Sequence, residues 1–126
     1  MKLTREEFEE AAVAALKRLP RFLKKKMENV DVVVEDWASQ DLLSQMGLRS
    51  PYALLGLYQG IPLNRRGYYY GNVLPDKITL FHIPIESVCK TREEVEEKVK
   101  EVVIHEVGHY FGLDDRRLRE LENGED

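Results

Sequence analysis

The first hydrophobic pattern along the chain has the spacing of a helix. Apolar residues recur every three or four positions, at Phe8, Ala11, Ala12, Ala15, Leu16 and Leu19. Thr4 and Glu7 precede them with the spacing of a capping box, so we expect the helix to begin directly after Thr4. Pro20 is expected to break or kink this helix, and a short second piece is predicted to run to about Met27.

Three later segments have the character of β-strands. Residues 30–34 are a β-branched run, residues 54–59 are followed by Gly60, and residues 78–83 are followed by Pro84. Residues 36–53 show no clear period and are predicted to form a loop that can include a helical turn. Residues 64–72 carry turn chemistry around three consecutive tyrosines, Tyr68, Tyr69 and Tyr70.

The C-terminal third predicts a long helix and a short one. Thr91 and Glu94 form a second capping-box pair, so the long helix is expected from about Arg92 to Phe111, with Gly112 ending it. A last helix is expected from about Arg116 to Glu122, with Asp114 or Asp115 as its N-cap. The sequence therefore predicts one compact α+β domain over residues 1–126, with a small sheet of three to four strands.

Composition narrows the range of partners and the compartment. The net charge of −4 argues against nucleic acid or an anionic membrane as a partner. The concentrated positive run, Lys24 to Lys26 with Arg21, is interpreted as the solvated face of a helix. Cys89 is the single cysteine, so no intrachain disulfide forms, which suits a reducing compartment. Without a signal-peptide pattern or a long apolar stretch, we expect a cytoplasmic protein; the sequence leaves the oligomeric state open.

The strongest chemical signal is the segment from His105 to Asp115, which spells H-E-x-x-H-x-x-G-x-x-D. Histidines four residues apart lie on one face of a helix, close enough for both imidazoles to bind one Zn²⁺ ion. For a chain of this composition, H-E-x-x-H arises by chance on the order of 1 time in 100. His105 and His109 are therefore predicted to be zinc ligands.

The position of Glu106 on the helix supports this prediction. At 100° per residue the helix has one broad apolar arc, and Ile104 lies at its margin. The arc consists of Val95, Val99, Val102, Val103, Val107 and Phe111. Glu106 lies inside that arc, where a carboxylate is costly unless a positive or protic group meets it. Zinc and its bound water meet this requirement, and the predicted role of Glu106 is the general base that takes the proton from that water.

The third zinc ligand is predicted to follow the motif helix. Gly112 permits a left-handed backbone conformation that can turn the chain back and bring Asp115 to the metal. Asp115 is our predicted ligand; Asp114, Glu120 and Glu122 are the alternatives. A catalytic zinc site keeps an open position, so three protein ligands are expected and not four.

The sequence around this zinc motif resembles that of a family of minimal bacterial zincin-like metallopeptidases, formerly described as a domain of unknown function. The resemblance extends in order over Leu19-Pro20, Leu54-Leu55-Gly56-Leu57-Tyr58-Gln59-Gly60-Ile61-Pro62-Leu63, Pro75-Asp76-Lys77-Ile78-Thr79-Leu80-Phe81 and the zinc motif. It implies a pared-down zincin fold with a small sheet above the active-site helix. It also implies His105 and His109 as zinc ligands, Glu106 as the catalytic residue and Asp115 as the further ligand.

The leading functional hypothesis is a zinc-dependent metallopeptidase that hydrolyses peptide bonds in peptides or exposed protein segments. The alternative is a non-catalytic, zinc-stabilised peptide- or protein-binding module; hydrolysis of another bond, such as in RNA, is disfavoured by the acidic charge. Residues 54–59 are the candidate edge strand for binding a peptide. His82 is expected on a strand face, Cys89 to be a buried or idle thiol instead of a zinc ligand, and Tyr68 to Tyr70 to pack at a hairpin tip.

Overall fold

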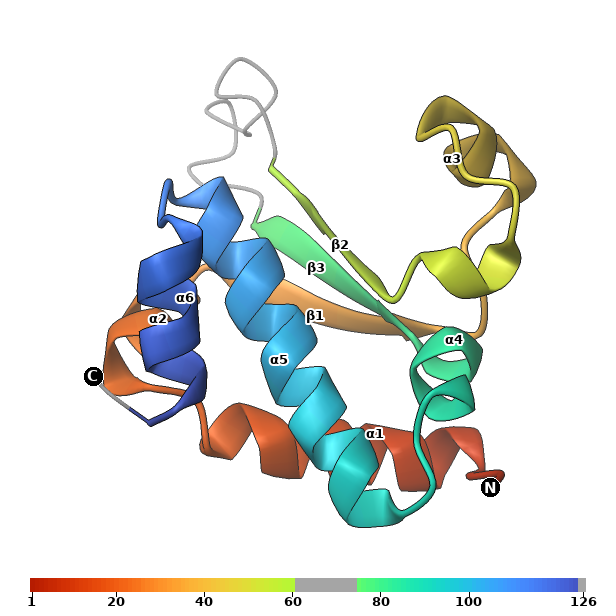
Figure 1. Cartoon of the computed structure of the whole chain (residues 1–126), viewed down its shortest axis with the longest axis horizontal. Coiled ribbons are helices and arrows are strands. Elements are labelled where there is room, and N and C mark those ends of the chain that lie inside the picture. Colours follow the sequence, from red (N-terminus) through yellow and green to blue (C-terminus); the bar gives the residue numbers. More distant parts are fainter. Residues whose placement is uncertain (61–74, 125–126) are drawn as a thin grey trace, which may run out of the picture.

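The computed structural model describes residues 1–60 and 75–124, and within them it has the α+β architecture that the sequence predicts (Figure 1). Along the chain the elements are α1 (Arg5–Lys17), α2 (Arg21–Lys26), β1 (Val30–Glu35), α3 (Gln40–Gln45), a 3-10 turn η1 (Pro51–Ala53), β2 (Gly56–Gln59), β3 (Asp76–Phe81), α4 (His82–Ser87), α5 (Arg92–Tyr110) and α6 (Asp115–Glu122). The turns expected within residues 64–72 and the packing expected of Tyr68 to Tyr70 lie outside the described residues. No helix of the described part is both long and apolar enough to cross a membrane.

The three strands form a mixed sheet in the order β1-β3-β2. β1 runs parallel to β3, with Val32 opposite Ile78, and β2 runs antiparallel to it, with Leu57 opposite Thr79. Among the described strands β2 is therefore an edge, as predicted for residues 54–59, although the strand itself begins two residues later.

Local signals set the helix ends. The Thr4 hydroxyl accepts from Glu7 N at 3.0 Å and the Glu7 carboxylate accepts from Thr4 N at 2.8 Å, so the predicted capping box is present. Pro20 separates α1 from α2, and Thr91 caps α5 through Glu94 N. These predicted boundaries are confirmed to within one or two residues.

Two predictions about secondary structure were wrong. The strand expected over residues 78–83 ends at Phe81, and His82 to Ser87 form a helix, α4. Pro84 does not break α4 because it lies in the first turn, where a backbone N–H has no partner within the helix in any case. The loop expected over residues 36–53 contains α3 and η1, both short and capped by serine side chains, Ser39 and Ser50.

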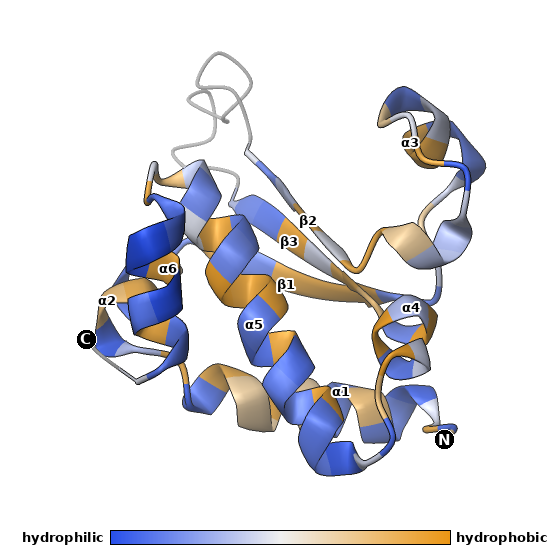
Figure 2. Ribbon diagram, in the orientation of Figure 1, coloured by the Kyte–Doolittle hydropathy of each residue, from blue (hydrophilic) through white to orange (hydrophobic). Residues whose placement is uncertain are grey.

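The main core lies between one face of the sheet and the helices. Ile78 and Leu80 of β3 point into it, whereas Phe81 belongs to a second, smaller cluster on the other side with Leu54. In Figure 1, α5 crosses in front of the strands, α1 crosses its lower half, and α6 lies beside its upper half. Figure 2 shows α6 as mainly hydrophilic, and its buried residues are Leu118 and Leu121.

The face of α5 that enters this core is nearly the predicted one. Val95, Val99, Val103 and Val107 are fully buried. Ile104 is also fully buried, so its predicted place at the margin was wrong: α6 packs over that side of α5 and extends the buried arc.

Two side chains weighed as ligands have structural roles. His82 is buried at the start of α4, with its ring stacked on Phe8 at 4.5 Å and its Nε2 3.3 Å from a Glu86 carboxylate oxygen; the prediction of a strand-face residue was wrong. Cys89 is buried as expected, and burial raises the pKa of its thiol. It lies three residues before the start of α5, and the helix rises about 20 Å from that start to His105, so Cys89 is not placed to bind zinc there.

Candidate metal centre

The candidate centre is built where α5 ends and the chain turns back. α5 stops at Tyr110, and Gly112 adopts the positive φ of +83° that the sequence predicted. Leu113 N–H donates to Gly108 O at 2.9 Å and Gly112 N–H donates to His109 O at 3.0 Å, which is the hydrogen-bond pair of a Schellman motif. The reversal lets α6 start at once and lie against α5.

Gly108, between the two histidines, allows α6 to approach closely. A Cβ atom at this position would collide with Leu118 Cδ2 and lie 3.6 Å from Leu113 Cδ1. Leu118 is fully buried in this contact. Gly108 therefore has a packing role: it brings the carboxylates of α6 to the histidines of α5.

Each histidine meets a carboxylate from α6. His109 Nε2 lies 3.2 Å from Asp115 Oδ1, and His105 Nε2 forms an ion pair with Glu122 Oε1. Asp115 and Glu122 are two helical turns apart, so both face α5. The two imidazole rings are nearly perpendicular, with centroids 5.7 Å apart.

The other two acidic candidates for third ligand are engaged elsewhere. Asp114 is the N-cap of α6 and accepts from Arg117 N at 2.8 Å. Glu120 faces the arginines of its own helix, at 3.7 Å from Arg116 and 3.5 Å from Arg117. Of the four acidic residues considered from the sequence, the structure brings Asp115 and Glu122 to the histidines.

A third carboxylate near His105 was missed by sequence reasoning. Among the described residues, Glu101, His105 and Glu122 have donor atoms within 4.8 Å of one another. Glu101 precedes His105 by four residues, so the same helical spacing that links the histidines could have found it. This set shares only His105 with the predicted set of His105, His109 and Asp115; the assignment of the zinc ligands stays a prediction.

The donor chemistry at this end of α5 fits a zinc ion. Imidazole nitrogens and carboxylate oxygens are both zinc ligands, and both imidazole Nε2 atoms already face acidic groups. Glu122 Oε1 is buried and pairs with His105 Nε2. A cation at this position would therefore meet negative charge that is poorly solvated.

Glu106 is half-buried on the side of α5 that faces the β2 edge. Burial raises the pKa of its carboxyl, and a hydrogen bond from the backbone N–H of Tyr58, together with His109 and His105, opposes the rise. A carboxylate with a raised pKa takes up a proton more readily at neutral pH. The sequence located this buried glutamate but not Tyr58, its partner from the sheet.

The contact with Tyr58 follows from the register of the sheet. Phe81 N–H donates to Leu55 O at 2.9 Å, and Leu57 pairs with Thr79. In an antiparallel ladder hydrogen-bonded pairs alternate, so the backbone groups of Gly56 and Tyr58 face away from β3. Those groups point to the edge of the described sheet, where Glu106 lies.

Tyr58 is held at both ends of its side chain. Its hydroxyl donates to Asp76 Oδ2 at 2.7 Å, and its ring stacks on Tyr110 with centroids 4.0 Å apart. Close packing of Gly56 on α5 fixes the same strand, since a Cβ there would lie 2.6 Å from Val102 Cγ1. β2 is thus anchored to α5 beside Glu106.

A groove of about 260 Å³ runs between the β2 edge and α5 and reaches the candidate centre. Its walls are Ala53, Leu54, Leu55, Gly56, Lys98, Glu101, Val102, His105 and Glu106. The groove therefore combines an apolar strand side with the acid and imidazole groups of the helix.

The mixed sheet, the long helix with its two histidines and the buried glutamate define a zincin-type domain. Residues 27–125 match the model of the zincin-like metallopeptidase family, so the chain belongs to that family. The resemblance seen in the sequence is thereby confirmed. Comparison with curated proteins gives no match.

Proposed function

We propose that the protein is a zinc-dependent peptidase in which His105, His109 and Asp115 hold the metal and Glu106 is the general base. Family membership supports a zinc peptidase fold. The observation that carries the catalytic proposal is the position of Glu106: its carboxyl is half-buried at the groove, next to both histidines, and its pKa is raised by burial. A zinc site with only a structural role has no need of such a group.

The choice of ligands rests on placement and coordination number. His105 and His109 share one face of α5, and Asp115 is already within 3.2 Å of His109. Three protein ligands leave one position open for substrate or water, as hydrolysis requires. In this ligand set Glu122 is not a ligand, so its ion pair with His105 must break when zinc binds.

In the reaction, bound zinc would polarise the peptide carbonyl and acidify a water molecule. Glu106 accepts the proton of the attacking water and passes it to the leaving nitrogen. The Tyr58 N–H donates to the Glu106 carboxylate and so orients it within the groove. Because Tyr58 is itself held by Asp76 and Tyr110, the hydrogen bond from its N–H fixes the position of the Glu106 carboxylate.

The proposed substrate is an extended peptide that adds a strand to β2. The backbone groups of Gly56 face the edge of the described sheet, and the groove there leads to His105 and Glu106. Main-chain hydrogen bonds of this kind bind a peptide with little dependence on its side chains. Leu54 and Leu55 would favour an apolar residue next to the cleaved bond.

The test compares wild type with Glu106→Gln, both loaded with zinc, on a mixture of fluorogenic peptides. The amide is nearly isosteric but cannot accept the proton, so we expect turnover to fall by about 100-fold or more while metal content and circular dichroism stay unchanged. Equal turnover by both proteins would remove Glu106 from the mechanism.

The alternative function, a peptide-binding module without catalysis, is supported by the same groove. It predicts that wild type and Glu106→Gln bind peptides equally and that neither cleaves them. Mass spectrometry of the peptide pool after prolonged incubation separates the two functions.

A further inference from the structure

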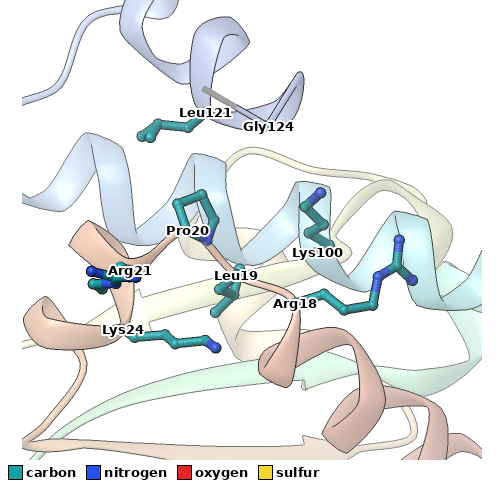
Figure 3. Close-up of a pocket in the computed structure, with 8 residues that line it drawn as sticks. All are labelled: Arg18, Leu19, Pro20, Arg21, Lys24, Lys100, Leu121 and Gly124. Carbon is teal, nitrogen blue, oxygen red and sulfur yellow. The ribbon is translucent and has the colours of Figure 1, made fainter. Parts of the chain in front are cut away.

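A second pocket, which contains neither histidine of the candidate centre, is lined by four cationic side chains from α2, α5 and the end of α1 (Figure 3). They are Arg18 at the end of α1, Arg21 and Lys24 of α2, and Lys100 of α5. The pocket has a volume of about 330 Å³, and none of the described residues that line it is acidic. This concentration of positive charge stands out in a protein with a net charge of −4.

The four cations differ in how they are held. Arg18 pairs with Glu96 at 3.4 Å and with Glu97, and Lys24 Nζ donates to the Lys17 carbonyl oxygen at 2.5 Å. Arg21 and Lys100 have no ion pair with any described residue. Two charges in the pocket are therefore fixed in direction, and two are not neutralised by the described protein.

Apolar and backbone groups complete the pocket. Leu19 and Pro20 lie between the cations, with Leu121 and Gly124 on the opposite side in Figure 3. Leu19, Pro20 and Leu121 are buried, so the wall is a fixed part of the fold. Arg18 is already paired with Glu96 and Glu97, so an anion that enters the pocket meets chiefly the charges of Arg21, Lys24 and Lys100.

We infer that this pocket binds a small polyvalent phosphate, either inorganic pyrophosphate or the phosphate groups of a nucleotide. Its volume lies at the lower end of the range for small-molecule sites, which suits a ligand of this size. Arginine forks match phosphate oxygens in pairs, and lysines add point charge. A single carboxylate carries one negative charge and would leave the remaining positive charge of the pocket unneutralised.

The sequence pointed to part of this site. Arg21 and Lys24 belong to the basic run that was interpreted as a solvated helix face. All four residues of that run are exposed, as predicted. Arg21 and Lys24 also line the pocket, whereas Lys25 does not, and Lys26 Nζ lies over the rings of Phe22 and Phe111. Arg18 and Lys100 join from other elements only in the folded chain.

A ligand in the pocket would connect three helices. Leu121 is the neighbour of Glu122, so the pocket touches the helix that faces the histidines. A molecule bound to α2, α5 and α6 at once stabilises the folded state by mass action. Pyrophosphate is therefore expected to raise the melting temperature of the metal-free protein as well as of the zinc-loaded one.

The experiment is calorimetric titration of the full chain, treated with chelator, with pyrophosphate, ADP and orthophosphate at low salt. We expect one site per chain, with pyrophosphate or ADP binding at least tenfold more tightly than orthophosphate and more weakly as salt is added. The Arg21→Ala/Lys100→Ala variant should weaken binding by about tenfold or more, whereas Lys25→Ala, which removes one positive charge from α2 outside the pocket, should change it less than about twofold.

The ranking of pyrophosphate and ADP tells which source of phosphate the site prefers. Absence of saturable binding would overturn the inference, and so would equal losses in the double variant and in Lys25→Ala. Binding of an RNA oligonucleotide without binding of the small phosphates would also overturn it. Since the titrations use metal-free protein, their result does not depend on whether the proposed peptidase activity exists.

Discussion

Gly108 of α5 and Leu118 of α6 are in contact so close that the glycine could not carry a side chain without moving the leucine. The contact lies between the two helices that supply every predicted zinc ligand. It links the packing of α6 to the geometry of the candidate metal centre.

Gly108→Ala tests this link. Alanine in place of glycine within a helix ordinarily gains about 0.5–1 kcal/mol, but here the added methyl group overlaps Leu118, and overpacking costs about 1–3 kcal/mol. We expect a net loss of about 1 kcal/mol in urea unfolding and zinc binding weakened by about tenfold in competition with a chelator. Adding Leu118→Val should make room and recover zinc affinity. A more stable Gly108→Ala protein with unchanged zinc affinity would contradict the packing role.

The metal assignment predicts one zinc per chain. His105→Ala and His109→Ala should each reduce the zinc that stays bound through gel filtration, and the double variant should retain none, because two of three ligands are gone. Elemental analysis measures this directly. Glu97→Ala, a change on the same helix away from the histidines, is the control. Full zinc occupancy in the double variant would place the metal elsewhere.

The third ligand is tested by comparing the acidic residues of α6. Asp115→Ala should weaken zinc binding much more than Asp114→Ala, since Asp114 is a helix cap worth about 1 kcal/mol of stability. Glu122→Ala should leave zinc affinity equal or higher, because it frees His105 Nε2 from its ion pair. If Glu122→Ala releases the metal and Asp115→Ala does not, the ligand set includes Glu122 and not Asp115.

The raised pKa of Glu106 predicts how stability depends on pH in the zinc-free protein. A carboxyl whose folded pKa lies above its ordinary value of 4.5 favours folding only while protonated. The contribution of Glu106 to the free energy of unfolding is fully present below the ordinary pKa. It is lost as the pH rises through the raised pKa of the folded state. Glu106→Gln lacks this loss, so the variant should become more stable than wild type as the pH goes from about 4 to 8.

Urea unfolding of both proteins in chelator, at several pH values, measures the difference. Every other titrating group is shared by the pair, so the change in the difference between them reports Glu106 alone. A wild-type protein that gains stability relative to Glu106→Gln as the pH rises would show that the folded pKa is lowered instead.

The sequence by itself determined the local features of this protein. Caps such as Thr4 and Thr91, the apolar period of α5 and the positive φ of Gly112 depend on residues a few positions apart, so they could be predicted without the fold. The same holds for His105, Glu106 and His109 on one turn of helix. Pro84 misled because the first turn of a helix tolerates a proline as well as a strand end does.

Only the tertiary structure decided which distant groups meet. The Tyr58 N–H reaches Glu106 because β2 pairs with β3 in one register; a shift by one residue would turn that N–H inward. Glu122 reaches His105 because Gly108 lets α6 pack closely, and Lys100 joins Arg21 only across α2 and α5. Such contacts depend on packing between elements far apart in the chain, which no local period or spacing encodes.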